Sequence, residues 1–510
     1  MKAQKEPAIH RPPSNEQCVS PVSASSLSDN EKRNAMSLFV TYVLVLGRSL
    51  ESSRGLLELL TPALALEVDD SPLSLSLHAA AIQLWCLINS RSFSSSDKIL
   101  TQAYSRLRTA IQDPLQRSCE STVLAALLLQ RYERFSAVWN QHEQCHVHRN
   151  GALALLRQQK LDGIHSKHRG YLISQLFHIE VNICISKKIP FQASEISWLT
   201  HQDLSILPSN PSTALDIIGA SIANHQHKFY LLSAEKFITA SEQELSHWNE
   251  ELEDTENQLH SWPDSVPRHW LPQTLQSGKH FDRSIITYAG YSDIYPNIQI
   301  ASIWNLWRTY CLLMLRIKLA LLDLFPSLYE VAGTTQDPLR HAFRIKSVQL
   351  AQESIDSICR SVSFHLGNYI KPASLSELMV PTILCASYHD MDPSHTSYTL
   401  YQNSSLFMSR DDHKRHVIVQ GPWHMMGTLS HVLSIFAHSE SHVLVHVLRE
   451  GQMDWVRTQF LRGLRLLRID LEGLSANNHG HFQADRGDLY VLNIASAEII
   501  AKRLVAALAG

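Results

Sequence analysis

The stretch Leu124-Ala125-Ala126-Leu127-Leu128-Leu129-Gln130-Arg131-Tyr132-Glu133-Arg134-Phe135 decides the fold class of this chain. Four of its apolar and aromatic side chains, at Leu124, Leu128, Tyr132 and Phe135, recur at intervals of three and four residues. This spacing places them on one face of an α-helix. The same spacing returns in residues 453–467, whereas the alternation typical of strands is nearly absent, residues 416–420 being the best short exception. The sequence therefore predicts an all-α protein.

The same helical spacing can be followed along the rest of the chain. Prolines Pro62, Pro72 and Pro114 mark helix ends or starts, because proline lacks a backbone N–H and fits only the first turn of a helix. Three zones read as irregular, namely 207–211, 263–296 and 391–422, and no fixed-period repeat is present. Helices are expected at 34–60, 73–90, 97–112, 118–135, 150–159, 167–187, 213–239, 241–260, 299–324, 338–366, 424–449, 452–469 and 488–508.

Composition limits the class of protein. With 510 residues and 44% hydrophobic side chains, the chain can bury one extended core or two abutting ones. Charged residues make up 18% and the net charge is −3, so no global electrostatic attraction to nucleic acid or anionic lipid is expected. No run of 18 or more apolar residues and no N-terminal apolar segment is present, so we expect neither membrane insertion nor secretion.

The N-terminal segment differs from the rest of the chain. Residues 1–32 are polar and rich in Pro and Ser, and such segments bury too little apolar surface to offset the entropy of ordering. We expect a disordered tail over 1–32 and a large, irregular, multi-helix domain over 33–510. The cysteines are scattered singly along the chain, which is typical of a reducing compartment such as the nucleus or cytosol.

One short motif indicates a metallopeptidase. His142-Glu143-Gln144-Cys145-His146 matches the H-E-x-x-H pattern, in which two histidines one helical turn apart hold Zn²⁺ and the glutamate acts as general base. The chain contains 28 histidines, however, so this pattern arises by chance in roughly one of a dozen to fifteen chains of similar composition. Arg149 and Ala152 stand where the extended form of the motif has its Gly and its third His.

A catalytic zinc also needs a third protein ligand. No glutamate lies between Val147 and Ile179, which leaves Asp162, His165 or His168 as the residues to consider. We therefore interpret the motif as a polar helix end or loop, and we keep a zinc peptidase as the alternative. No catalytic, cofactor-binding or metal-ligating residue is assigned, and no cofactor is expected.

Two further polar series have both a functional and a structural interpretation. After His431, three histidines, His438, His442 and His446, stand four residues apart, which favours a solvated or inter-helix hydrogen-bonding face over metal binding or pH sensing. The arginines Arg457, Arg462, Arg465 and Arg468 stand beside Trp455 and Phe460. Helical spacing places Arg457, Arg465 and Arg468 on the solvent side of the helix, and a charged outer face explains the series better than a phosphate-binding patch, which needs concentrated positive charge.

A cluster of aromatic and polar residues within 299–324 is ambiguous in the same way. Trp304, Asn305, Trp307 and Arg308 are compatible with a ligand site, but a tryptophan-rich core helix is the simpler interpretation. Known enzyme templates are otherwise missing: the chain has no G-x-S-x-G elbow, no G-x-G-x-x-G fingerprint and no phosphate-binding loop. The sequence therefore predicts a protein that is not an enzyme.

Five colinear segments resemble one known family. The segment Ile358-Cys359-Arg360-Ser361-Val362-Ser363-Phe364-His365-Leu366-Gly367 closely resembles an "ICxSVPFHLG" segment in the regulatory region of fungal zinc-cluster transcription factors. Four other blocks resemble the same family in the same order, namely Leu127-Leu128-Leu129-Gln130-Arg131-Tyr132-Glu133, Gly151-Ala152-Leu153-Ala154-Leu155-Leu156, Ala301-Ser302-Ile303-Trp304-Asn305-Leu306-Trp307-Arg308 and Gly421-Pro422-Trp423. The resemblance covers residues 35–467. The family's "WxxHxxGA" block also resembles Trp139-x-x-His142 followed by His148-x-x-Gly151-Ala152, with a few residues inserted.

The chain departs from that family in one respect. Members normally begin with a binuclear zinc cluster built on C-x2-C-x6-C runs, whereas the closest cysteines here, Cys119 to Cys145 and Cys359 to Cys385, are 26 residues apart. We therefore expect the DNA-reading module to be absent, lost or encoded elsewhere.

The resemblance implies a nuclear transcriptional regulator, of the kind that often controls a pathway gene cluster. It implies contacts with the transcriptional machinery or with a DNA-binding partner, and in some members the sensing of a small-molecule effector. Direct contact with DNA stays open, although no reading module is visible, and exposed helix faces allow a homodimer. A ligand-binding helical scaffold without a role in transcription is the remaining alternative.

Overall fold

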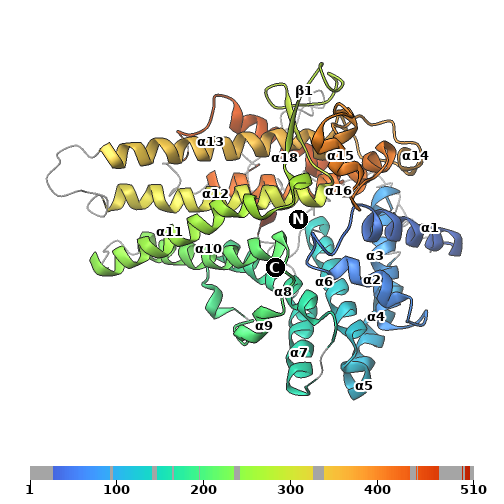
Figure 1. The fold of residues 1–510 in the computed structure, drawn as a ribbon. Coiled ribbons are helices and arrows are strands. Elements are labelled where there is room, and N and C mark those ends of the chain that lie inside the picture. Colours follow the sequence, from blue (N-terminus) through green and yellow to red (C-terminus); the bar gives the residue numbers. More distant parts are fainter. Residues whose placement is uncertain are drawn as a thin grey trace, which may run out of the picture.

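Helix α12 (Ile298–Leu324) is the central element of the fold, because most of its 27 residues are buried. A helix that is buried on all sides lies in the middle of a protein rather than at its surface. It packs against α13 (Pro338–Leu366), α16 (Arg410–Phe436), α10 (Pro211–Ala234) and α11 (Glu242–Ser265). Figure 1 shows α10 to α13 extending side by side as the long arm of the molecule.

The structure is a computed structural model. It describes residues 27–91, 96–140, 146–163, 166–194, 196–234, 242–325, 338–436, 444, 446–469, 497, 500–502, 504 and 505.

A second group of helices forms the N-terminal part of the fold. Helix α3 (Pro72–Ile88) packs against α1 (Asp29–Phe39), α4 (Asp97–Gln112) and α6 (Glu120–Asn140), and α6 packs against α7 (Val147–Leu161). The start of α3 follows from its sequence, because Ser71 caps the helix by accepting from the Ser74 N–H and Pro72 occupies the first turn.

The N-terminal group and the central group are joined across a large sequence distance. The indole Nε1 of Trp139 in α6 donates to the backbone carbonyl of Leu467, just after α18 (Gln452–Leu466), at 2.7 Å. Helix α18 in turn packs against α16. The two ends of the described chain are therefore parts of one core.

The remaining elements are shorter or lie between these groups. Their bounds are η1 (Val40–Val45), α2 (Leu56–Leu64), α5 (Pro114–Arg117), α8 (Arg169–Lys187), η3 (Phe191–Ala193), α9 (His201–Ser205), η4 (Arg268–Trp270), α14 (Leu375–Met379), η6 (Tyr388–Asp390) and α15 (Thr396–Gln402). Helix α8 packs against α10 and thereby links the N-terminal helices to the central ones.

Two short strands were missed by the sequence analysis. Strands β1 (Gln273–Gln276) and β2 (Tyr291–Ile294) pair antiparallel, with Gln273 opposite Ile294, inside the zone expected to be irregular. The hairpin packs against α13 through β2. Four-residue strands show too few alternations to stand out from a loop. Since the described residues hold only this one two-stranded sheet, the prediction of an all-α, multi-helix fold is confirmed.

The first helix begins before the predicted domain boundary. Helix α1 starts at Asp29, and Ser28 and Glu31 form a capping box in which each side chain satisfies a backbone N–H of the other residue. Leu27 is already buried. The boundary predicted at residue 32 therefore lies inside a helix, and the predicted tail over residues 1–26 lies outside the described residues.

Residues 416–420, which show the best strand-like alternation and belong to the zone 391–422 expected to be irregular, lie inside α16. His416, Val417 and Ile418 are buried there against neighbouring helices, so tertiary packing outweighs the strand preference of the Val-Ile-Val run. The helix predicted over 424–449 was wrong in its bounds. The observed helix, α16, spans Arg410–Phe436 and contains Pro422.

The helix predicted over 34–60 is interrupted. It is replaced by α1, the π-helical turn η1 and α2, with non-helical backbone between η1 and α2. The helix predicted over 488–508 lies mostly outside the described residues, although the described positions 497, 500–502, 504 and 505 are helical. In the described part of the chain, no helix has the length and apolar character needed to cross a membrane.

Candidate functional site

The metal motif lies at the junction of α6 and α7. Helix α6 ends at Asn140, α7 begins at Val147, and His146 stands just before α7. Residues 141–145, and with them His142 and Glu143, lie outside the described residues. Across the described ranges, no group of three or more His, Cys, Asp or Glu side chains has the arrangement to hold a metal ion. A metal-free protein stays a prediction.

The side chains considered as a third zinc ligand have other roles. The imidazole Nδ1 of His168 contacts the Glu120 carboxylate at 2.9 Å. Asp162 follows the end of α7 and accepts from the Gln158 amide at 2.8 Å, whereas His165 lies outside the described residues. His148 pairs with Glu133 of α6 at 2.8 Å, which ties α7 to α6.

The histidine face predicted for His438, His442 and His446 lies largely outside the described residues. His431 is half-buried on α16, and burial lowers its pKa to about 4, so this imidazole is neutral at physiological pH. His446 is exposed in a turn, whereas His438 and His442 lie outside the described residues. The described members of the series therefore do not share one surface.

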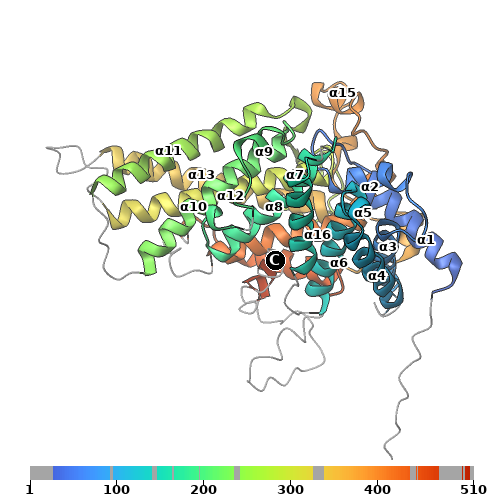
Figure 2. The same ribbon diagram turned by 90° about the horizontal axis from the view of Figure 1, so that it is seen from below.

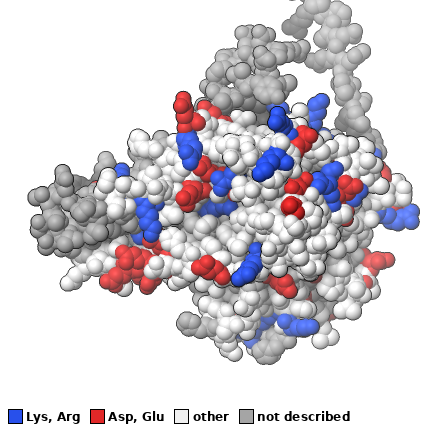
Figure 3. All heavy atoms as spheres, turned by 45° about the horizontal axis from the view of Figure 1, so that its top comes forward, with Lys and Arg blue, Asp and Glu red and all other residues white. Residues whose placement is uncertain are grey.

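The arginine series of α18 divides between solvent and core. Arg465 and Arg468 are exposed and Arg457 pairs with Asp454, as expected for an outer face. Arg462 is different, because it is buried and donates to the carbonyls of Leu366 and Gly367 at the end of α13, at 3.1 and 2.7 Å. It holds the carbonyl end of α13, whereas the arginines predicted on the solvent side were Arg457, Arg465 and Arg468. On the face in Figure 3, basic and acidic side chains are interspersed.

We define the tryptophan groove as the depression between α11, α12 and α13, with a volume of about 220 Å³. Figure 1 shows these three helices side by side. Helix α12 contributes the aromatic and basic part of the lining, and α11 and α13 contribute carboxylates and hydroxyls. The polar and aromatic lining residues are Glu256, His260, Trp304, Trp307, Arg308, Cys311, Glu353, Ser354 and Ser357.

The tryptophans of the groove are part of the core as well as of its wall. Trp304 is 4% exposed and donates through Nε1 to the carbonyl of Trp270 at 2.9 Å. Trp307 is half-buried and donates to the Leu259 carbonyl at 2.8 Å. Trp262 contacts both rings, with centroid distances of 5.1 and 6.2 Å. Trp304 and Trp307 thus pack in the core, as expected, and they also line the groove.

A buried polar network lies under the groove floor. Arg308 donates to the Tyr295 hydroxyl at 2.7 Å and to the Asn305 amide oxygen at 2.9 Å. Asn305 donates to Ser361 Oγ at 3.0 Å, which joins α12 to α13. Burial raises the pKa of Tyr295 to about 12, so its hydroxyl stays protonated. Fully satisfied networks of this kind fix the relative position of helices.

The chemistry of the groove favours binding over catalysis. Burial raises the pKa of the Cys311 thiol, which keeps it protonated and poorly nucleophilic. Ser354 donates to the Leu350 carbonyl at 2.8 Å, and Ser357 accepts from Arg360 at 2.8 Å, so neither hydroxyl is paired with a base. Glu256 pairs with the buried Lys318. Aromatic edges flanked by carboxylates suit a flat or cationic group.

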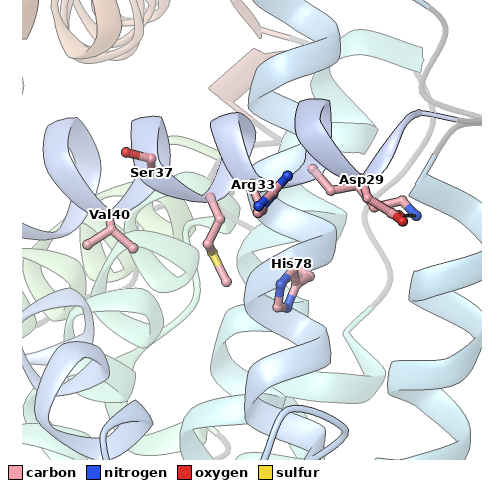
Figure 4. A pocket seen from close by; sticks show the side chains of 7 residues that line it. Asp29, Arg33, Ser37, Val40 and His78 are labelled. Carbon is pink, nitrogen blue, oxygen red and sulfur yellow. Dashed lines mark hydrogen bonds and ion pairs between the residues drawn. The ribbon is translucent and has the colours of Figure 1, made fainter.

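A larger but more open depression lies between α1 and α3 (Figure 4). Its volume is about 540 Å³, and its lining residues are Asp29, Lys32, Arg33, Met36, Ser37, Val40 and His78. Lys32 and Asp29 are paired at 2.9 Å, and His78 Nδ1 contacts the Ser74 carbonyl at 2.9 Å. Exposed pairs of this kind contribute little energy and attract no particular ligand, so we favour the tryptophan groove as the candidate site.

The sequence indicated only part of this groove. Trp304, Trp307 and Arg308 stood out in one helix, but Glu256, Glu353, Ser354 and Ser357 lie on two other helices and gave no signal of their own. Comparisons with protein-family models, curated proteins and solved structures found no match for this chain.

Proposed function

We propose that this chain is a transcriptional regulator that works in the nucleus through its helical domain. The proposal is supported by the positions that the resembling segments take in the fold. The five segments that resemble the regulatory region of fungal zinc-cluster factors lie on α6, α7, α12, α13 and α16. In the fold α6 contacts the next helix, α7, and α12 and α13 both contact α16, which lies later in the sequence.

Individual residues of the segments make these contacts. Asn305 of α12 bonds to Ser361 of α13 at 3.0 Å. The backbone of Gly421 in α16 lies against the carbonyl of His365 in α13. Arg131 of α6 lines the same cavity as Trp423 of α16. Segments selected by one shared resemblance are expected to meet if they form one functional unit.

The surface supports indirect targeting of DNA. Sequence-specific readers place concentrated positive charge and a base-contacting element at one surface. Here the net charge is −3, and the arginines of α18 divide between ion pairs, carbonyl contacts and solvent. In this proposal a DNA-binding partner supplies the sequence selectivity, and the tryptophan groove receives a segment of a partner or an effector.

Two experiments test the proposal. Deletion of the gene is expected to change a defined set of transcripts, and reintroduction of the wild-type gene restores them. The purified chain is expected to bind duplex DNA weakly and without sequence preference at physiological salt. Tight, sequence-selective binding contradicts the indirect mechanism, and an unchanged transcriptome contradicts the regulator function itself.

A pair of variants tests the groove. When the full chain is fused to a foreign DNA-binding domain, it is expected to alter expression of a reporter gene. Glu353→Arg, at the groove rim, reverses an exposed charge and is expected to reduce that response. Glu253→Arg makes the same change on the exposed side of α11 and serves as the matched control. Equal responses of the two variants contradict a role for the groove.

A further inference from the structure

Two arginines on α6, Arg131 and Arg134, form no ion pair with another residue of the described chain. Arg131 and Arg134 lie one helical turn apart, and no hydrogen bond or ion pair joins either guanidinium to another described residue. The Nε atom of each is buried and without a hydrogen-bond partner. Their contacts are instead with aromatic rings: Arg131 lies 4.9 Å from the centroid of Phe135 and Arg134 lies 5.9 Å from that of Trp423.

The charges around this pair do not balance it. Burial lowers the pKa of Arg131 to about 9, with further contributions from the neighbouring Arg134 and Arg48 guanidiniums. The acid that acts on Arg131 is Glu58, and its carboxylate already accepts from Arg48 at 3.3 Å. His424 on α16 stays neutral, because burial and Arg48 lower its pKa well below the ordinary value. The region thus carries more positive than negative charge.

Leaving such groups unpaired is energetically unfavourable. Both side chains are half-buried, and withdrawing even part of a charged group from water costs free energy that a cation–π contact, worth about 0.5–2 kcal/mol, only partly returns. Burial also lowers the pKa of Arg134, to about 10, but both groups stay charged at neutral pH. An anion placed against these guanidiniums therefore gains the charge-assisted hydrogen bonds that the protein itself does not supply.

A cavity is present at this position. Residues of α3, α6 and α16 line it, and its volume is about 50 Å³; α3 and α6 pack against each other at this place (Figure 2). Arg131 forms part of its wall, together with the side chains of Gln83 and Gln420. The rings of Phe135, Trp139 and Trp423 form an apolar wall, with Phe135 and Trp423 centroids 4.2 Å apart.

We propose that this cavity binds a short-chain carboxylate, whose oxygens accept from the Arg131 guanidinium while its alkyl part lies against Phe135 and Trp423. The planar fork of arginine matches a carboxylate with two parallel hydrogen bonds. A cavity of about 150 Å³ holds benzene, so a space of about 50 Å³ suits an acid of the size of acetate or propionate. The aromatic wall disfavours a phosphate dianion, which needs donors on every side. The site is independent of the tryptophan groove and goes beyond the proposed function.

The full-length protein is tested with sodium acetate and sodium propionate as probes. Sodium chloride and sodium phosphate at matched ionic strength control for screening and for non-specific anions. Propionate is expected to raise the thermal midpoint in a saturable way, because a ligand bound only to the folded state stabilises it by mass action. Fluorescence of Trp139 and Trp423 is expected to change over the same concentration range. An equal shift with chloride or phosphate overturns the carboxylate assignment, and no shift with any anion overturns the site.

Two substitutions assign the effect to Arg131. Arg131→Met removes the charge and is expected to abolish the propionate shift, while the apo variant is about as stable as the wild type because an unpaired, half-buried charge is gone. Arg131→Lys keeps the charge but not the fork, so it is expected to weaken propionate binding about tenfold. Arg106→Met removes an exposed guanidinium from α4 and is expected to leave the shift unchanged. A propionate shift that survives in both Arg131 variants contradicts the proposal.

Discussion

Gly421 of α16 lies directly against the backbone carbonyl of His365 in α13. A Cβ atom at position 421 would stand 2.0 Å from that oxygen, far inside van der Waals contact. The carbonyl belongs to the helix end where Gly367, with a φ of +51°, terminates α13 in a left-handed conformation. The two helices can approach this closely only because position 421 has no side chain.

Gly421→Ala is therefore expected to destabilise the protein by at least about 1–3 kcal/mol, since the backbone of α13 or α16 must move. Gly427, on the same helix, offers a matched control, because a Cβ there meets nothing within 4 Å. Gly427→Ala is expected to be neutral or to stabilise by up to about 1 kcal/mol. Urea denaturation of both variants measures the difference, and equal effects would contradict the close approach.

Trp304→Ala is expected to cost about 3–5 kcal/mol, because it removes a buried indole and its hydrogen bond to the Trp270 carbonyl. Leu66→Ala, at a side chain that is 89% exposed, is expected to stay within about 0.5 kcal/mol of the wild type. Denaturant unfolding followed by circular dichroism gives both values. An unchanged midpoint for Trp304→Ala would show that α12 is peripheral.

His365 is expected to make the protein sensitive to acid. Its Nδ1–H donates to the Ser361 carbonyl at 2.8 Å, its Nε2 is buried without a partner, and burial lowers its pKa from 6.5 to about 4. The unfolded chain therefore takes up a proton below pH 6.5 that the folded chain resists. The stability linked to His365 is complete above pH 6.5 and is lost as the pH falls toward 4.

The corresponding variant separates this effect from general acid unfolding. His365→Met lowers stability at neutral pH but is expected to flatten the dependence of the unfolding free energy on pH between 6.5 and 4. His260→Gln, at an exposed position of α11, is expected to leave that slope unchanged. A slope that is the same in His365→Met and in the wild type rules out the assignment.

The purified protein is expected to contain no stoichiometric zinc. The prediction follows from the missing cysteine pairs, and from His146 lying outside any helix, since the H-E-x-x-H geometry needs both histidines on one helix face. Elemental analysis after dialysis provides the measurement. One bound equivalent that disappears in His142→Ala would restore the peptidase alternative.

The long, apolar helices were predictable from local pattern. The spacing of Leu124, Leu128, Tyr132 and Phe135 gave α6, and the segment 299–324 differs from α12 by one residue. Where a tertiary effect competed, the local pattern failed, as in the Val-Ile-Val run of α16. The start of α1 had a local signal, the Ser28–Glu31 capping box, which the polar composition of the preceding residues obscured.

Sites were less predictable than helices. Arg131 and Arg134 sit one turn apart in an otherwise apolar stretch, and that pattern alone also fits a solvated stripe. Only the placement of Trp423, almost 300 residues later in the chain, shows that Arg134 lies against an aromatic ring. The lining of the tryptophan groove likewise depends on how three helices meet, which no single segment encodes.

The hydrogen bond from Trp139 to the Leu467 carbonyl bears on synthesis of the chain. Its partners are separated by 328 residues. At roughly 5–20 residues per second, a ribosome needs about 15 to 65 s to make the intervening segment. During that interval synthesis of α16 and α18 is not complete. These helices therefore cannot yet cover Phe135 and Trp139 at the C-terminal end of α6. Nascent chains stalled in this interval are therefore expected to bind chaperones that recognise exposed aromatic residues, and to release them once residue 467 has emerged.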